Sequence, residues 1–271
     1  MAEFSGQLTL RAEARPDGRT VLATQSFRAP YHISKPYWDE AARTLLVQVV
    51  NPTAGILSGD RLESNITVAE NAALLVTTPS ASRVFKMKDG TAECRQHFTV
   101  ASGGWLEVLP EPLVPHRGCV YRQMTHIEVA TGGALFFADL LMPGRVGHGE
   151  AWAWEKLCLE IDVRLSGELI LRERFTHSGA ALRALAELNG SGPTACFGNA
   201  VLLAEGTATW IPAVTALHRA GIWLGVSALR RGGWSLKCVA PDSLRLRQTM
   251  LELRRILAGH FPKLACDPRK L

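Results

Sequence analysis

One eleven-residue phrase occurs twice in this chain, and a weaker copy precedes both. "VASGGWLEVLP" begins at Val100, and "VATGGALFFAD" begins at Val129, 29 residues later. The weaker copy, "VAENAALLVTT", begins at Val68, 32 residues before the first. Each copy ends one extended segment, turns through small or polar residues and starts another apolar segment. Because self-similarity at a nearly constant period is typical of stacked supersecondary units, this phrase constrains the fold more than any other feature.

The spacing of 29 to 32 residues accommodates two or three short strands and their turns in each unit. The glycine pairs 103–104 and 132–133 supply the left-handed or strained backbone that each corner needs. A plain antiparallel meander or sandwich is the alternative, because paired glycines are also common in hairpin turns. We predict a mainly β fold, built as a β-helix-like stack of short strands with a small α-helical part near the C-terminus.

Strand patterns dominate the first two thirds of the chain. The clearest is "LCLEIDVRL" at 157–165, where apolar and polar residues alternate strictly. Alternation of period two requires an extended chain with one buried face. The segments 7–13 and 61–68 show the same pattern, and "PDGR" at 16–19 predicts a turn.

Helical patterns come late, at 179–190, 212–221 and 244–259. The third begins after a capping Asp242 or Ser243 and ends at Gly259, as helix start and stop signals require. Its residues Leu244, Leu251, Ile256 and Leu257 suggest an apolar stripe that docks either on the chain's own sheet or on a partner. We predict a single domain over 1–271, with β layers over 7–178 and helices mixed in over 179–260.

Composition excludes several classes of protein. Hydrophobic residues make up 47% of the chain, but the longest apolar runs hold about five residues, too few to span a bilayer. The start has neither a basic nor an apolar signal region, so we expect a cytoplasmic protein with no membrane partner. The six cysteines are scattered singly, which is neither a disulfide framework nor a zinc knuckle. The basic C-terminal segment lacks the interleaved aromatic residues of a nucleic-acid binder.

Catalytic phrases are absent from the sequence. It contains no GxSxG, HExxH, P-loop or GxGxxG motif. The nearest approaches to a metal site are "HRGC" at 116–119 and "GHGE" at 147–150, and neither supplies three or four clustered ligands. The rival hypothesis is a β-helix carbohydrate-active enzyme with paired carboxylates as acid and base. An aromatic content of only 7% argues against a long sugar-binding groove.

Five stretches, in this order and at these separations, resemble the urease accessory protein UreD family, also called UreH. They are "NPTAGILSGDRLE" (51–63), "LLVTTPSASRVFK" (74–86), "GGWLEVLPEPLVPHRG" (103–118), "ADLLMPGRVGHGE" (138–150) and "GELILRERF" (167–175). The resemblance implies a non-enzymatic scaffold and chaperone that acts with UreF and the nickel-carrying GTPase UreG on apo-urease. It implies no tightly bound cofactor, nickel only in transit, and no nucleic-acid partner.

Carboxylates in the resembling region are the candidates for nickel transit, because they stand at strand ends or in adjacent loops: Asp60, Glu107, Glu111, Asp139 and Glu150. Asp139 interrupts an apolar run, where an ionised side chain is costly unless it is paired or wetted. Two interpretations remain open: a buried salt bridge with Arg145 or Arg83, or the acidic lining of a water-filled passage. Oxygen ligands hold nickel weakly, which suits transit. The structural or loop candidates are Gly59, Thr77, Thr78, Arg83 and Arg145.

Overall fold

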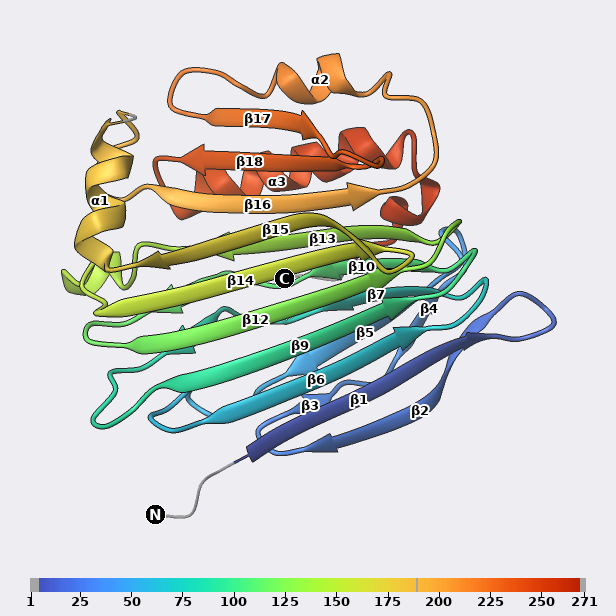
Figure 1. Ribbon diagram of the computed structural model, residues 1–271, viewed down its shortest axis with the longest axis horizontal. Helices are drawn as coiled ribbons and strands as arrows, with labels where there is room; N and C mark the ends of the chain where they lie inside the picture. The colour runs from blue at the N-terminus through green and yellow to red at the C-terminus, as the bar shows by residue number, and fades with distance from the viewer. Residues whose placement is uncertain (1–4, 189, 269–271) are drawn as a thin grey trace.

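A computed structural model describes residues 5–188 and 190–268, and its strands form two sheets stacked face to face (Figure 1). The first sheet has the order β15–β14–β12–β9–β6–β1–β2, and the second has β17–β18–β16–β13–β10–β7–β5–β3. The first comprises β1 (Ser5–Ala14), β2 (Thr20–Arg28), β6 (Arg61–Val68), β9 (Ala92–Val100), β12 (Val120–Val129), β14 (Lys156–Leu165) and β15 (Glu168–His177). The second comprises β3 (His32–Ile33), β5 (Thr44–Val50), β7 (Ala73–Thr77), β10 (Trp105–Leu109), β13 (Ala134–Leu141), β16 (Cys196–Leu203), β17 (Trp223–Ala228) and β18 (Trp234–Ala240), with β4 (Tyr37–Asp39) paired to β5.

Successive coils alternate between the sheets. The chain runs from β6 to β7, from β9 to β10 and from β12 to β13, and within each sheet these strands pair in parallel. The loops on the return path carry two further short strands, β8 (Ser82–Val84) and β11 (Leu113–Pro115), which are also parallel. The chain is therefore a solenoid-like stack of coils, as the repeat predicts, rather than an antiparallel meander.

The repeated phrase marks the same corner in three consecutive coils. Ala101 donates its backbone N–H to Val68 O at 2.9 Å, and Ala130 donates to Val100 O at 2.8 Å. Gly132 has φ +76°, in the region that favours glycine. At Gly133 a Cβ atom would lie 2.8 Å from the carbonyl oxygen of Ala101 in the coil below. The glycine pair is thus required both by the turn and by the close approach of stacked backbones.

Antiparallel hairpins close the stack at both ends. β1 pairs with β2 around the predicted turn, and β14 pairs with β15. β16, β18 and β17 extend the second sheet in antiparallel fashion beyond β13. Figure 1 shows the consequence: the second sheet continues past β15, the edge strand of the first sheet, so the first sheet does not cover β18 and β17.

The helices are α1 (Gly179–Leu188), α2 (Ile211–Thr215) and α3 (Ser243–Ala258), with 3₁₀ turns η1 (Val146–His148) and η2 (Pro262–Ala265). α1 and α3 lie where the sequence predicts them, and Asp242 caps α3 by accepting a hydrogen bond from Arg245 N at 2.8 Å. α2 is shorter than predicted, because after Leu217 the chain turns back through the Arg219–Ile222 bridge into β17.

The predicted apolar stripe of α3 is wrong in part. Leu257 is buried, but Leu244 and Leu251 are 64% and 53% exposed. The face that packs on the second sheet comprises Leu246, Met250, Leu253 and Leu257. These residues follow the spacing of four, three and four that one helix face requires. The sequence left open whether this helix packs on the chain's own sheet or on a partner. In the structure, α3 packs on the chain's own second sheet.

At the corner end, apolar residues fill the core between the sheets. There Leu10, Ile66, Phe98, Ile127 and Val163 form a continuous inward row across the first sheet, each buried. A second apolar cluster fills the space between the second sheet and α3. Among the described residues, no helix is long and apolar enough to cross a membrane.

Candidate functional site

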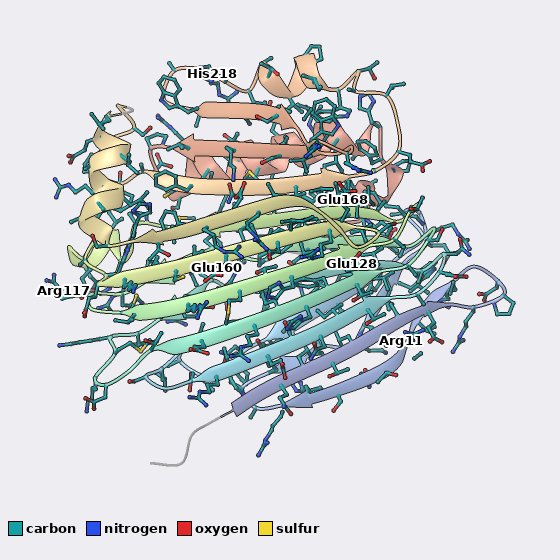
Figure 2. All side chains as sticks on the ribbon, in the orientation of Figure 1. Arg11, Arg117, Glu128, Glu160, Glu168 and His218 are labelled. Atoms are coloured by element: carbon teal, nitrogen blue, oxygen red, sulfur yellow. The ribbon has the colours of Figure 1, made fainter. Side chains whose placement is uncertain are left out.

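Midway along the strands, the inward row of the first sheet becomes polar. Ser64, Gln96 and Thr125 are register partners on β6, β9 and β12. Thr125 Oγ1 donates a hydrogen bond to Gln96 Oε1 at 3.0 Å. The same row continues through Ile161 on β14 to Glu173 on β15. Successive residues of a strand point to opposite faces, so this row faces the second sheet, in contrast to Glu128, which lies on the outer face in Figure 2.

The second sheet presents a matching polar row. Asp139 on β13 is the register partner of Asn199 on β16, which in turn partners Lys237 on β18. The neighbours of Asp139 on the same face of its strand are Phe137 and Leu141, both buried. Both sheets therefore carry an inward polar row, flanked on either side by apolar residues.

A cavity of about 610 Å³ lies between these rows. Its lining includes Gln96, Glu111, Asp139, Glu173, Asn199 and Lys237. It also includes Thr77, Thr78 and Arg83 from the loop candidates. Two of the five predicted carboxylates, Glu111 and Asp139, thus line one cavity, together with two further acids, Glu160 and Glu173, that are not among those predicted from the sequence.

Asp139 has an unusual environment for a carboxylate. No described residue donates a hydrogen bond to it, and its charged neighbours are Glu173 and Lys237. Burial is the main cause that raises the pKa of Asp139 to about 7, and the Glu173 carboxylate raises it further. Arg145, one of the two partners considered for Asp139, instead forms an ion pair with Glu150. The Asp139 side chain is only partly accessible, and the cavity it lines is its route to water.

Glu111 stands where β10 leads into the loops. Its backbone N–H donates to Thr78 Oγ1 at 2.7 Å. Its carboxylate Oε1 lies 3.4 Å from Arg247 Nη2 on α3. Thr77, the neighbour of Thr78, donates from Oγ1 to Leu109 O at 2.6 Å. Thr77 therefore fixes the end of β10, and Thr78 positions Glu111, which follows β10 in the chain.

Glu107 lies on the other face of β10, toward α3. Its carboxylate accepts from Arg254 Nε at 2.6 Å and from Arg254 Nη2 at 3.0 Å, and it is 0% exposed. Glu107 is not among the residues that line the cavity. We therefore treat it as a residue that binds α3 to the sheet.

The two remaining carboxylates lie outside the cavity lining. Asp60 accepts a hydrogen bond from Leu57 N at 2.8 Å and so closes the turn that contains Gly59, whose φ is +80°. Burial raises the pKa of Asp60. Glu150 binds Arg145 through two hydrogen bonds of 2.9 and 2.7 Å, which lower the pKa of Glu150 to about 2. Both acids thus stabilise loops beside the stack.

No group of three or more His, Cys, Asp or Glu side chains in the described part of the chain is placed to hold a metal ion. His116 and Cys119 of the "HRGC" stretch are both buried. Burial lowers the pKa of His116 and raises the pKa of the Cys119 thiol to about 12. The cavity carboxylates are the remaining oxygen donors, and Glu173 lies close enough to Asp139 to raise the pKa of Asp139.

Comparison with known proteins decides the family. A family model described as UreD urease accessory protein matches residues 5–270. The chain belongs to the UreD family. A UreD urease accessory protein of Opitutus terrae is 62% identical over 271 residues, covering 99% of this chain and 100% of that protein. UreD 2 of Brucella canis is 32% identical over 205 residues, covering 74% of this chain and 67% of that protein. UreD of Yersinia enterocolitica is 38% identical over 146 residues, covering 53% of this chain and 45% of that protein.

Membership of the UreD family confirms the resemblance of the five sequence stretches. It makes the chain an accessory protein of urease and not a catalytic enzyme. The carboxylates around the cavity therefore need another explanation than the acid and base of a glycosidase.

Proposed function

We propose that this UreD chain is a scaffold and chaperone for nickel insertion into apo-urease, acting in a complex with UreF and UreG in the cytoplasm. Nickel is its cargo, and the cavity between the two sheets is where the cargo passes. The family match supports the link to urease maturation. The finer roles rest on the resemblance of the sequence and on the chemistry of the cavity.

The observation that carries the proposal is the Asp139 carboxylate. It lies in the cavity, between apolar neighbours, with no hydrogen-bond donor among the described residues. A carboxylate in such a place costs folding free energy, so a purely structural account leaves it unexplained. A cavity that a divalent cation enters transiently gives the carboxylate a function.

Oxygen ligands also suit a transient occupant. Ni²⁺ binds imidazole and thiolate more strongly than carboxylate, so a pair of carboxylates releases it more readily than a His or Cys cluster would. We therefore expect the chain to bind nickel with micromolar or weaker affinity and without a site of fixed stoichiometry.

The experiment is urease activation with Asp139→Asn, which removes the charge and keeps the volume. The matched control is Asp60→Asn, the same change at a carboxylate outside the cavity lining. We expect both variants to express and to bind UreF and apo-urease, while activated urease falls several-fold only with Asp139→Asn. The proposal fails if the Asp139 variant loses activity only in proportion to lost protein or lost complex.

A further inference from the structure

Lys237 occupies the edge of the inward polar row. Along the second sheet the row runs from Asp139 through Asn199 to Lys237. Neighbouring strands are about 4.8 Å apart, so the backbone of Lys237 lies roughly 10 Å from that of Asp139. Its strand, β18, belongs to the part of the second sheet that extends past β15 (Figure 1).

Lys237 is paired across the two sheets. Its Nζ contacts both carboxylate oxygens of Glu173 on β15, the edge strand of the first sheet. Asn199 Nδ2 lies 3.4 Å from Glu173 Oε2 and so contacts the same carboxylate. All three residues line the cavity. The Lys237–Glu173 ion pair thus joins the polar row of the second sheet to the first sheet.

The pair stands between solvent and Asp139. The Lys237 side chain is 49% exposed and that of Glu173 is 26% exposed, so the cavity reaches solvent at this end. The ammonium group occupies both oxygens of the outermost carboxylate, and its charge repels any cation approaching Asp139. While this pair is formed, Glu173 is not available to a divalent cation that enters at this end.

We propose that Lys237 is a displaceable counter-ion, and that a divalent cation enters the cavity by taking its place on Glu173. Asn199, by turning its amide oxygen inward, and Asp139 are the next oxygen ligands along the row. Lysine suits this role because its ammonium is a point charge on a flexible stem that can move into solvent. This inference rests on the proposed passage of nickel and adds the residue that controls entry at the β15–β18 end of the cavity.

The test is calorimetric titration of Ni²⁺ into the full-length chain, with thermal unfolding as a check of the fold. Lys237→Met removes the charge and keeps most of the side-chain length, and we expect it to bind Ni²⁺ about ten-fold more tightly than the unmodified chain. Lys237→Arg keeps the charge and should bind no more tightly than the unmodified chain. Lys88→Met, an exposed residue outside the cavity lining, controls for the change in net charge.

Two further variants locate the effect. In Lys237→Met with Asp139→Asn, the gain in affinity should disappear, because the deeper ligand is lost. If Lys237→Met proves unstable, Lys237→Gln keeps a donor for Glu173 and should show the same gain. Unchanged affinity in the folded Lys237 variants, or a gain that survives the Asp139 change, would overturn the inference.

The outcomes separate this inference from the proposed function. If Asp139→Asn lowers urease activation but the Lys237 variants bind Ni²⁺ like the unmodified chain, the passage stands and the counter-ion role falls. If the Lys237 variants bind more tightly but Asp139→Asn activates urease normally, the cavity binds cations without delivering them.

Discussion

Arg254 on α3 holds the carboxylate of Glu107 on β10 with two hydrogen bonds, from Nε to Oε1 at 2.6 Å and from Nη2 to Oε2 at 3.0 Å. The same Nη2 donates to Cys266 O at 2.6 Å, so one guanidinium joins the sheet, the helix and the segment that follows η2. The side chains are 10% and 0% exposed. Removing either partner alone breaks the pair and leaves the other charge buried with weaker compensation.

We expect Arg254→Met to lower the free energy of unfolding by about 3–5 kcal/mol. Glu107→Gln should have a smaller effect in the same direction, because the amide oxygen still accepts one hydrogen bond. The double change Glu107→Leu with Arg254→Met should recover much of the loss, since apolar residues replace both charges. Urea unfolding measures all three. If Glu107→Gln instead leaves stability unchanged and lowers urease activation, Glu107 belongs to the nickel path after all.

The corner glycines give a second prediction. Gly133→Ala places a methyl group 2.8 Å from Ala101 O and 3.0 Å from Ala130 O, both backbone atoms that cannot move aside cheaply. We expect a loss of about 1–3 kcal/mol, the usual cost of overpacking. Gly147→Ala is the control, because its Cβ would meet no atom within 4 Å. Equal stability of the two variants in thermal unfolding would contradict the close stacking of the corners.

The stacked coils could be predicted from the sequence because the same corner phrase recurs in successive coils. Each corner needs small residues for the same two reasons, the turn and the contact with the next coil, so the phrase recurs once per coil. The start of α3 could also be predicted, because its signal is local: the Asp242 side chain accepts a hydrogen bond from Arg245 N, only three residues ahead. The packing face of α3 could not be predicted, because Leu244 and Leu251 form an equally regular stripe. Only contact with the sheet selects the stripe that contains Leu246 and Leu253.

The sequence likewise reveals the role of some of the acidic residues and not of others. All five residues of β10 are buried, so alternation cannot reveal that Glu107 and the cavity lie on opposite faces. Asp139 was recognisable because it takes an inward position between Phe137 and Leu141. Glu173 carries the same signal, between Leu171 and Phe175, but the flanking Arg172 and Arg174 hide it in the sequence. Asp139 and Glu173 contact residues of β16 and β18 that are far away in the sequence, and no local pattern reveals such contacts.

Thr77 and Thr78 provide a matched pair at the cavity. Thr78→Val removes the acceptor of the Glu111 N–H, and Thr77→Val removes the donor to Leu109 O. Each should cost about 1–2 kcal/mol, since a backbone group loses its partner. Only Thr78→Val should also reduce urease activation beyond the loss of folded protein, because it releases the segment that places Glu111. Similar activation by the two variants, at equal protein level, would argue against a role for Glu111.

The last prediction concerns acid unfolding. Asp162 on the outer face of β14 accepts hydrogen bonds from Arg172 at 3.1 and 3.0 Å and from Arg174 at 2.9 Å. The bonds from Arg172 contribute most to lowering the pKa of Asp162 from 3.8 to about 2. A carboxyl whose pKa is lower in the folded chain binds fewer protons there than in the unfolded chain. Its stabilisation is therefore present above its unfolded pKa and is lost as the pH falls through the folded one.

Asp162→Asn should therefore lower the free energy of unfolding at neutral pH by about 1–2 kcal/mol, a value reduced by the solvent exposure of both arginines. The difference from the unmodified chain should shrink between about pH 5 and pH 2, where Asp162 itself becomes protonated. Urea unfolding across this range measures it. Asp17→Asn, in the exposed β1–β2 turn, is the control, because Asp17 accepts from Arg19 N without a buried partner. A deficit of the Asp162 variant that is the same at every pH would show that the charge of Asp162 contributes nothing and that only its shape matters.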